Sequence, residues 1–419
     1  MSSLSSNLQR RIFLPVEQYS QEISTMSASW LRNQFPFSFF PTKNECHSTV
    51  LIIHGKERTS SEIIHSLKSA IRQPNITTLL FRGVNFENNK LRTAALNLIH
   101  SNRTWECIGV SNCTSSGGQE LNSVLQAIVA TSAKRLLLKE TCLIGAIGIL
   151  EQGLRTNKAV TQLDLFACYL EDADLAVLVR ALVSHPSLQK LDLACNRCRA
   201  EGLKAISALL SSNPKHLQVI DMVDQGLVDD QTLDLALLES GLTTNTNLHL
   251  LTLSMNKLSG VSNLARSLTR NNALRALRLN SCDLSTNDMK DFAKHLPQMN
   301  GLKNLWLSGS QQWNKKDEEC VVVIDAIREA LQRNYDMEAI YFPNSIQDNI
   351  IQHILDWNRG GRRLLLAQPN TFSSVCWPLV LERAMRVQLS TGIQQPNLSA
   401  RRVDILYNLL RSGSVIETR

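Results

Sequence analysis

The chain has 419 residues, enough for two or three ordinary domains or for one long repeat domain. Hydrophobic residues make up 43% of it but aromatic residues only 5%, so leucine and other aliphatic side chains must fill any core. Residues 358–419 hold nine arginines, no lysine and three acidic residues, and so carry six of the seven net positive charges. The nearly neutral remainder argues against a body that binds nucleic-acid backbones along its length.

The composition also bears on where the protein works. No apolar run is long enough to span a membrane, and the first residues lack the apolar stretch of a secretory signal. Ten cysteines scattered through so long a chain favour reduced thiols over a disulfide framework, which is typical of short secreted domains. We therefore expect a cytoplasmic protein, with the nucleus as the alternative.

Residues 1–46 differ from everything that follows them. The stretch RNQFPFSFFPTK (32–43) is aromatic and interrupted by prolines, and it shows no repeat. We expect this segment to be an N-terminal cap that covers the exposed core of the first repeat, because terminal repeats need such a cover. A segment that docks on a peptide is the alternative.

A short motif recurs through residues 47–345. LQKLDLACNRC (188–198) fits the template L-x-x-L-x-L-x-x-N-x-L, and so do LRALRLNSCDL (274–284) and several looser copies. Residues 48–55 supply an earlier copy, in which Val50 takes the fourth template position. In the other copies that position recurs every 26 to 35 residues, at Leu79, Ile108, Leu136, Leu163, Leu191, Ile220, Leu251, Leu277, Leu305 and Ile340. The sequence therefore predicts eleven repeats.

Each column of the template has a physical reason. The Leu-x-Leu core predicts a short strand whose alternate side chains point inward. The Asn or Cys column follows, where a small polar side chain can hydrogen-bond to neighbouring backbone in a stacked ladder. Residues 171–185 then show helical apolar spacing. One such unit cannot bury its leucines alone, so the units are expected only as an array.

This motif resembles the ribonuclease-inhibitor class of leucine-rich repeats, over roughly residues 48–345. The resemblance implies an α/β solenoid in the form of a horseshoe, with a parallel sheet on the concave side and helices on the convex side. Cys195 and Cys198 of the CNRC stretch fall in repeat columns, and no second CxxC pair exists. We interpret them as structural thiols rather than as a redox or zinc site.

Residues 346–419 leave the period and show helical apolar spacing in 348–366, 373–387 and 401–413. This segment is similar to the tail of uncharacterised leucine-rich-repeat proteins from microbial eukaryotes. We expect a helical, basic C-terminal cap. A short helical tail after a repeat array also resembles that of ubiquitin-ligase substrate receptors, which is the sharper alternative.

No motif of a known catalytic class stands out. The sequence contains no Walker loop, GxSxG, HExxH or GxGxxG after a strand, and its nine histidines are dispersed. We therefore expect no enzyme activity, cofactor, metal or small-molecule substrate, and binding to nucleic acid or membrane is not predicted.

The candidate site lies on the strand face that points away from the leucines. Asp164, Asp192 and Asp221 occupy one column in consecutive repeats, so their carboxylates should repel unless cations or a partner's basic groups offset them. Whether this ladder binds a partner or is merely solvated stays open. Exposed Trp306 and Tyr341 share a column too. The predicted protein-binding residues are Asp164, Phe166, Lys190, Asp192, Asp221, Asp224, Arg278, Trp306 and Tyr341.

These observations favour a non-enzymatic scaffold that holds a partner protein on its concave face, with a basic segment of the partner at the acidic ladder. Two alternatives remain from regulatory classes. One is a GTPase-activating protein of the leucine-rich-repeat type, although the known example has an acidic tail and this tail is basic. The other is the ubiquitin-ligase receptor.

Overall fold

The computed structural model describes residues 49–56, 58–73, 75–101, 104–114, 118–226, 231–309, 318–342 and 348–359. The chain divides into two compact units between Ser259 and Gly260, here called unit 1 and unit 2. The expected N-terminal cap and the helices predicted at 373–387 and 401–413 lie outside the described residues, as does the tail on which the ubiquitin-ligase alternative rests. No helix among the described residues is long and apolar enough to cross a membrane.

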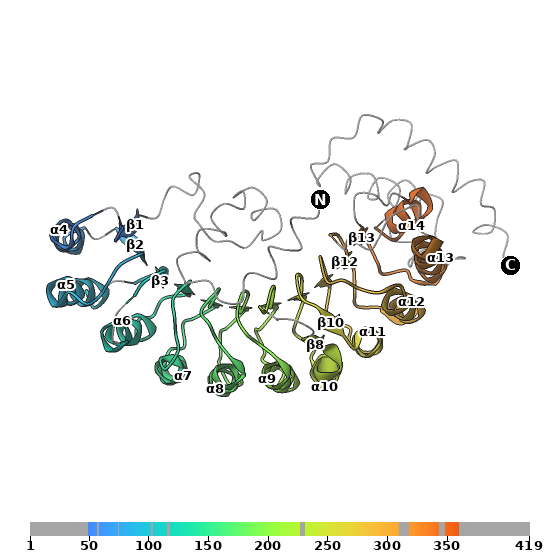
Figure 1. Ribbon diagram of the computed structural model, residues 1–419, viewed down its shortest axis with the longest axis horizontal. Helices are drawn as coiled ribbons and strands as arrows, with labels where there is room; N and C mark the ends of the chain where they lie inside the picture. The colour runs from blue at the N-terminus through green and yellow to red at the C-terminus, as the bar shows by residue number, and fades with distance from the viewer. Residues whose placement is uncertain are drawn as a thin grey trace, which may run out of the picture. The chain divides into compact units, whose positions relative to one another are not determined.

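Unit 1 is built from alternating strands and helices (Figure 1). Its strands lie parallel, each beside the next along the chain: β1 (Thr49–His54), β2 (Ile76–Arg82), β3 (Cys107–Ser111), β4 (Arg135–Lys139), β5 (Gln162–Asp164), β6 (Lys190–Asp192), β7 (Val219–Asp221) and β9 (Leu250–Thr252). A second, small sheet pairs β8 (Leu233–Asp234) with β10 (Leu258–Ser259).

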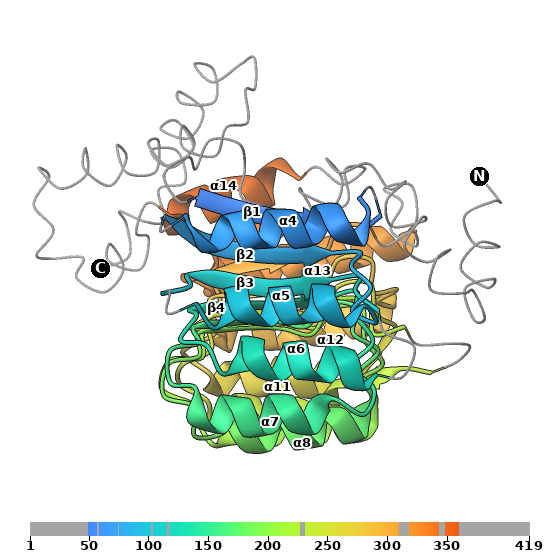
Figure 2. The same cartoon turned by 90° about the vertical axis from the view of Figure 1, so that its left-hand side faces the viewer.

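The helices of unit 1 cover one side of this sheet, and Figure 2 shows the first five of them stacked in chain order. They are α4 (Ser60–Ile71), α5 (Asn89–Ile99), α6 (Gln119–Val129), α7 (Ile147–Thr156), α8 (Asp172–Leu182), α9 (Ala200–Ser211), the 3₁₀ helix η2 (Leu235–Leu238) and α10 (Glu239–Thr244). The buried leucines of strands and helices face each other, which is how the repeats form one core.

Unit 2 repeats the plan. Its parallel strands are β11 (Ala276–Arg278), β12 (Asn304–Trp306) and β13 (Ala339–Tyr341). Its helices are α11 (Val261–Arg270), α12 (Thr286–His295), the 3₁₀ helix η3 (Leu296–Gln298), α13 (Glu318–Arg333) and α14 (Asn349–Arg359). The predicted α/β solenoid of leucine-rich repeats is thus confirmed in both units.

The strand registers test the predicted period directly. Leu163 of β5 pairs with Leu191 of β6, and Leu191 pairs with Ile220 of β7, so the fourth template positions face one another as predicted. The first repeat is a correction, because Leu51 and not Val50 pairs with Leu79. Four apolar residues in a row, 50–53, leave the phase of that strand ambiguous in the sequence. The register fixes it.

In nine repeats the chain leaves the strand through one residue with left-handed backbone angles. In most of these the N–H of that residue donates to the following repeat, as Cys195 N does to Val223 O at 2.8 Å, so the sheet ladder continues into the turn. Left-handed backbone angles cost a non-glycine residue roughly 1 kcal/mol. Most of the repeats therefore carry this cost. With φ between 47° and 82°, these residues are Gly83, Asn112, Glu140, Ala167, Cys195, Asp224, Met255, Ser281 and Gly309.

The predicted Asn and Cys ladder is confirmed at the next position. Asn196 Nδ2 donates to the carbonyl oxygens of Leu165 and Leu193, both at 2.9 Å, and its Oδ1 accepts from the N–H groups of Cys168 and Leu170. Thiols act as weaker donors in other repeats. The column comprises Cys113, Thr141, Cys168, Asn196, Gln225, Asn256 and Cys282.

The ladder cysteines, and Cys107 and Cys198 near them in the sequence of the repeats, are buried and form no disulfide among the described residues. Burial raises the pKa of Cys107 to about 11 and that of Cys113 to about 12, and it raises the pKa of Cys198 further. Thiolates are the forms that attack disulfides and bind metals. These groups therefore stay protonated at neutral pH, in agreement with a structural thiol at Cys198, whereas Cys195 is partly exposed.

A second asparagine ladder, which the sequence reading missed, joins the helix ends. Asn157 Nδ2 donates to Val129 O at 3.0 Å, and Asn334 Nδ2 donates to Leu296 O and Met299 O. Asn358 repeats this with Asn334 O and Met337 O. Helix α14, which the sequence placed within the C-terminal cap, therefore attaches to unit 2 in the way that repeat helices do.

Candidate binding surface

In unit 1, one column of side chains runs across neighbouring strands on the face opposite the leucine core. The registers pair Asp164 with Asp192, Asp192 with Asp221, and Asp221 with Thr252. These four residues are between 2% and 7% exposed. The carboxylates predicted from the sequence are therefore brought together, and they are not the freely solvated charges that one alternative supposed.

Two lysines offset part of this negative charge within unit 1. Lys139 Nζ lies 2.7 Å from Asp164 Oδ2, and Lys190 Nζ lies 3.8 Å from Asp192 Oδ2. Burial alone would lower the pKa of Lys139, but the charge and hydrogen bond of Asp164 outweigh it and the pKa is raised. For Lys190 burial prevails over the nearby carboxylates and its pKa is lowered. The pair at Asp192 is therefore the weaker of the two.

The surroundings of Asp192 disfavour its ionised form. Its burial, and then the charges of Asp164 and Asp221, raise its pKa to about 7, against the opposing pull of Lys190 and Lys139. An ordinary aspartate is fully ionised at neutral pH. The ionised form of Asp192 is therefore less favoured than that of an ordinary aspartate, so the charge at this position depends on pH.

The three aspartates also accept hydrogen bonds from the backbone. Each Oδ1 accepts from the N–H group two residues further on: Asp164 from Phe166 at 3.2 Å, Asp192 from Ala194 at 3.1 Å and Asp221 from Val223 at 3.2 Å. Asp in this column is therefore partly structural, because it satisfies a backbone donor at the end of a strand. The sequence feature that indicates this role is the Asp that recurs at the end of the strand in each of three repeats.

The remaining predicted residues of unit 1 flank the column. Lys190 lies on β6 beside Gln162 of β5. The Phe166 ring has Lys139 Nζ 5.7 Å from its centroid. Asp224 lies in the turn after β7, where its Oδ1 accepts from Gly226 N at 3.3 Å. It is therefore a turn residue rather than a member of the strand column.

In unit 2, the same column holds planar side chains. The registers pair Arg278 with Trp306 and Trp306 with Tyr341. The Arg278 guanidinium carbon lies 4.9 Å from the Trp306 ring centroid, and the Trp306 and Tyr341 rings stack with centroids 4.9 Å apart and planes 11° apart. Tyr341 is 41% exposed. The predicted aromatic pair is therefore brought together, and Arg278 completes the stack, a link that the sequence reading missed.

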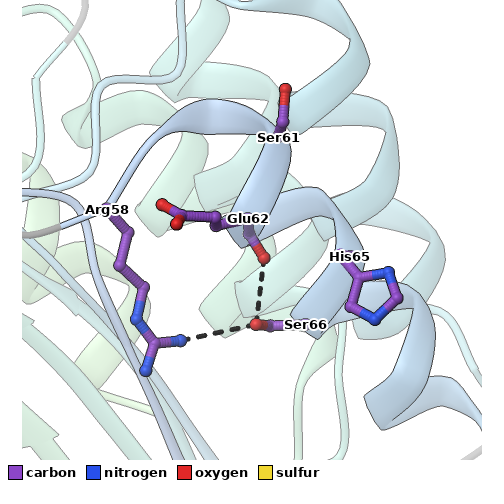
Figure 3. Close-up of a pocket in the computed structure, with 5 residues that line it drawn as sticks. All are labelled: Arg58, Ser61, Glu62, His65 and Ser66. Atoms are coloured by element: carbon purple, nitrogen blue, oxygen red, sulfur yellow. Dashed lines mark hydrogen bonds between the residues drawn. The ribbon is translucent and has the colours of Figure 1, made fainter.

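The described residues offer little for other chemistry. They contain no group of three His, Cys, Asp or Glu side chains that could hold a metal ion. A surface hollow at α4 is lined by Arg58, Ser61, Glu62, His65 and Ser66 (Figure 3). Its side chains are engaged locally, since Arg58 donates to Ser66 at 3.4 Å and the Glu62 carboxylate accepts from Thr59.

Comparison with known proteins finds a relative for part of the chain. No protein-family model matches the chain. The human NACHT, LRR and PYD domains-containing protein 13 is 29% identical over 238 residues, 54% of this chain, and the chain spans only 22% of that protein's length.

Solved structures are similar at lower identity. The leucine-rich repeat-containing protein LegL7 from Legionella pneumophila is 16% identical, with a TM-score of 0.47 over 73% of this chain and 96% of that one. A chain of the yeast Rad7 and Elc1 complex is 18% identical, with a TM-score of 0.44 over 68% and 75%. The repeated strand, left-handed turn, Asn or Cys ladder and helix carry the assignment. The chain is a leucine-rich-repeat protein.

Proposed function

We propose that the protein is a non-enzymatic scaffold that binds a partner protein on the strand faces of its repeats. In unit 2 the partner contacts Arg278, Trp306 and Tyr341. In unit 1 a basic segment of the partner lies along the acidic column and its neighbours. The contact residues are those predicted: Asp164, Phe166, Lys190, Asp192, Asp221, Asp224, Arg278, Trp306 and Tyr341. The proposed setting is the cytoplasm, and the segments 1–46 and 346–419 are proposed as caps.

The stack of Arg278, Trp306 and Tyr341 is the observation that carries this proposal. Three large side chains stand outside the leucine core, one on each of three neighbouring strands, and lie against one another. Mutual stacking fixes their rotamers before a partner arrives, so less side-chain entropy is lost on binding. Tryptophan, tyrosine and arginine are also enriched at interface hot spots, the residues whose truncation costs the most binding free energy.

Affinity capture tests the proposal. The full chain serves as bait in an extract of its source cells, and the captured proteins are quantified for wild type, Trp306→Ala and Tyr341→Ala. We expect at least one protein to fall roughly tenfold or more with Trp306→Ala, because truncating such a residue typically costs above 1 kcal/mol.

The matched control is Val321→Ala. Val321 is 49% exposed on α13 and so tests the helix side of unit 2. Circular dichroism checks that every variant folds. A partner that is captured equally by wild type and both strand-face variants, but lost with Val321→Ala, would place the binding surface on the helices and contradict the proposal.

A further inference from the structure

The second asparagine ladder, at the helix ends, has a histidine in one of its places. Three of its asparagines each accept two backbone N–H groups, two and three residues further on. Asn245 Oδ1, for example, accepts from Asn247 N at 3.0 Å and from Leu248 N at 2.7 Å. His185 takes the corresponding place after α8, three residues before Leu188, the first leucine of its repeat motif.

His185 makes these two contacts with a ring nitrogen. Its Nδ1 accepts from Leu188 N at 3.2 Å and from Ser187 N at 3.5 Å, and the residue is only 6% exposed. A ring nitrogen accepts only while it carries no proton, so the neutral ring holds its proton on Nε2. An amide oxygen of asparagine accepts at every pH, whereas Nδ1 stops accepting once the ring is charged.

The surroundings of His185 oppose a charged ring. Burial lowers the pKa of His185, the backbone carbonyl of Asn157 in the preceding repeat raises it by less, and the positive charge of Lys158 lowers it further. Lys158 is the charged group that acts from the neighbouring repeat. On α8 itself the last turn carries Arg180, which pairs with Glu151 at 3.2 Å. The neutral ring is therefore the form that suits the folded repeat.

The turn at residues 183–188, between α8 and β6, also joins two repeats. Ser187 Oγ donates to Lys158 O and to Val160 O of the preceding repeat, both at 2.8 Å. Leu188 is 3% exposed, and β6 begins two residues after it. If His185 lost its acceptor nitrogen, two buried backbone donors would face a positively charged ring. The turn, and with it the contact between the two repeats, would then be weakened.

We propose that His185 makes this turn of unit 1 sensitive to acid: protonation of Nδ1 breaks both backbone hydrogen bonds and opens the turn between α8 and β6. The step is one proton transfer. A proton from solvent takes the lone pair of Nδ1, the imidazole becomes an imidazolium, and the N–H groups of Ser187 and Leu188 lose their acceptor. The turn closes again when the proton leaves. The device belongs to the fold and does not depend on the proposed binding surface.

The direction of the pH dependence follows from proton linkage. In the open turn the ring is solvated and titrates near its ordinary pKa of about 6.5, whereas in the closed turn the pKa of His185 lies below that value. The open form therefore binds more protons. The closed turn loses stability as pH falls from about 6.5 towards the lower pKa, by at most roughly tenfold in the opening equilibrium per pH unit, and is insensitive to pH well above this window.

Amide hydrogen exchange on the full chain measures this opening. Exchange at Leu188 is followed at pH 7.5, 6 and 5 and corrected for the intrinsic effect of pH, which gives a protection factor. Relative to His185→Asn, which keeps an acceptor at every pH, we expect wild-type protection to fall by roughly threefold or more from pH 7.5 to pH 5. His65→Asn, the same change at an exposed histidine of α4, should match wild type. A constant ratio between wild type and His185→Asn would overturn the proposal.

Nitrogen NMR of the histidine rings tests the same proposal in the wild-type chain. The ring signals of His185 are identified by their loss in His185→Asn or, if that variant does not fold, in His185→Gln. At pH 8 we expect a proton on Nε2 and none on Nδ1, and we expect the ring to become charged only below pH 6.5. A proton on Nδ1 at pH 8, or a ring already charged at pH 7, would overturn the proposal whatever the variants do.

Discussion

The strand faces of units 1 and 2 use the same column of the repeat for different chemistry. In unit 1 the column holds Asp164, Asp192 and Asp221, buried and partly neutralised by lysines. In unit 2 it holds the guanidinium and two rings of the Arg278, Trp306 and Tyr341 stack. The backbone is alike in both, since strand, left-handed turn and helix recur. A leucine-rich repeat therefore fixes where a side chain stands, and the residue type alone decides what the position can bind.

The largest expected effect concerns the ladder that holds this backbone. Asn196→Ala removes the amide that satisfies Leu165 O, Leu193 O and the N–H of Cys168. We expect it to lower the free energy of unfolding by roughly 3 kcal/mol in urea denaturation, because buried backbone groups lose their partners.

The corresponding change in unit 2 is Cys282→Ala. The Cys282 thiol donates to Asn280 O at 3.5 Å and is a weaker donor than an amide. We expect a loss of about 1 kcal/mol. Equal losses for the two variants would show that the ladder does not depend on the chemistry of its side chains.

A smaller effect is expected in unit 1 only, where the acidic column should make stability depend on pH. Between pH 4 and pH 7 the folded chain holds more protons than the unfolded chain, because the pKa of Asp192 is raised from 3.8 to about 7. Its contribution to the free energy of unfolding therefore falls as pH rises through this window and is constant above it.

Asp192→Asn removes that penalty and keeps an acceptor for Ala194 N. We expect the variant to be more stable than wild type at pH 8 and nearly equal to it at pH 4. Thermal denaturation at both values measures the difference. A variant less stable at pH 8 would show that the ionised carboxylate stabilises the cluster.

The smallest effect belongs to the stack. Arg278→Lys keeps the charge but loses the planar contact with Trp306. We expect about 0.5 kcal/mol less stability, together with a shift in the tryptophan emission spectrum. An unchanged spectrum would indicate that the guanidinium does not lie on the ring in solution.

Much of the fold and of the candidate surface could be predicted from the sequence, because each repeat gives an independent copy of the same local pattern. The strands, the helices, the Asn and Cys ladder, and the shared columns of Asp192 and Trp306 all followed from it. The pairing of Lys139 with Asp164 did not, because the two residues lie in different columns of different repeats. The burial of Asp192 could not be predicted from the sequence either, because it depends on side chains from several neighbouring strands and not on one motif.

Two further misses have local causes. The register of β1 is ambiguous in an unbroken apolar run and was set by its pairing with β2. An asparagine after a helical stretch is typical of a helix end, and nothing in one repeat shows that the amide of a residue such as Asn157 bonds to the preceding repeat. A terminator and a ladder residue look alike in sequence.

Site-specific photo-cross-linking tests the central claim, that the strand face is the binding surface. A photoreactive phenylalanine analogue replaces Tyr341 on β13 or, as the control, Val321 on α13, and the chain is irradiated in the extract used for capture. We expect one partner to cross-link at position 341 and not at position 321. Cross-links at 321 alone would place the partner on the helices and contradict the claim.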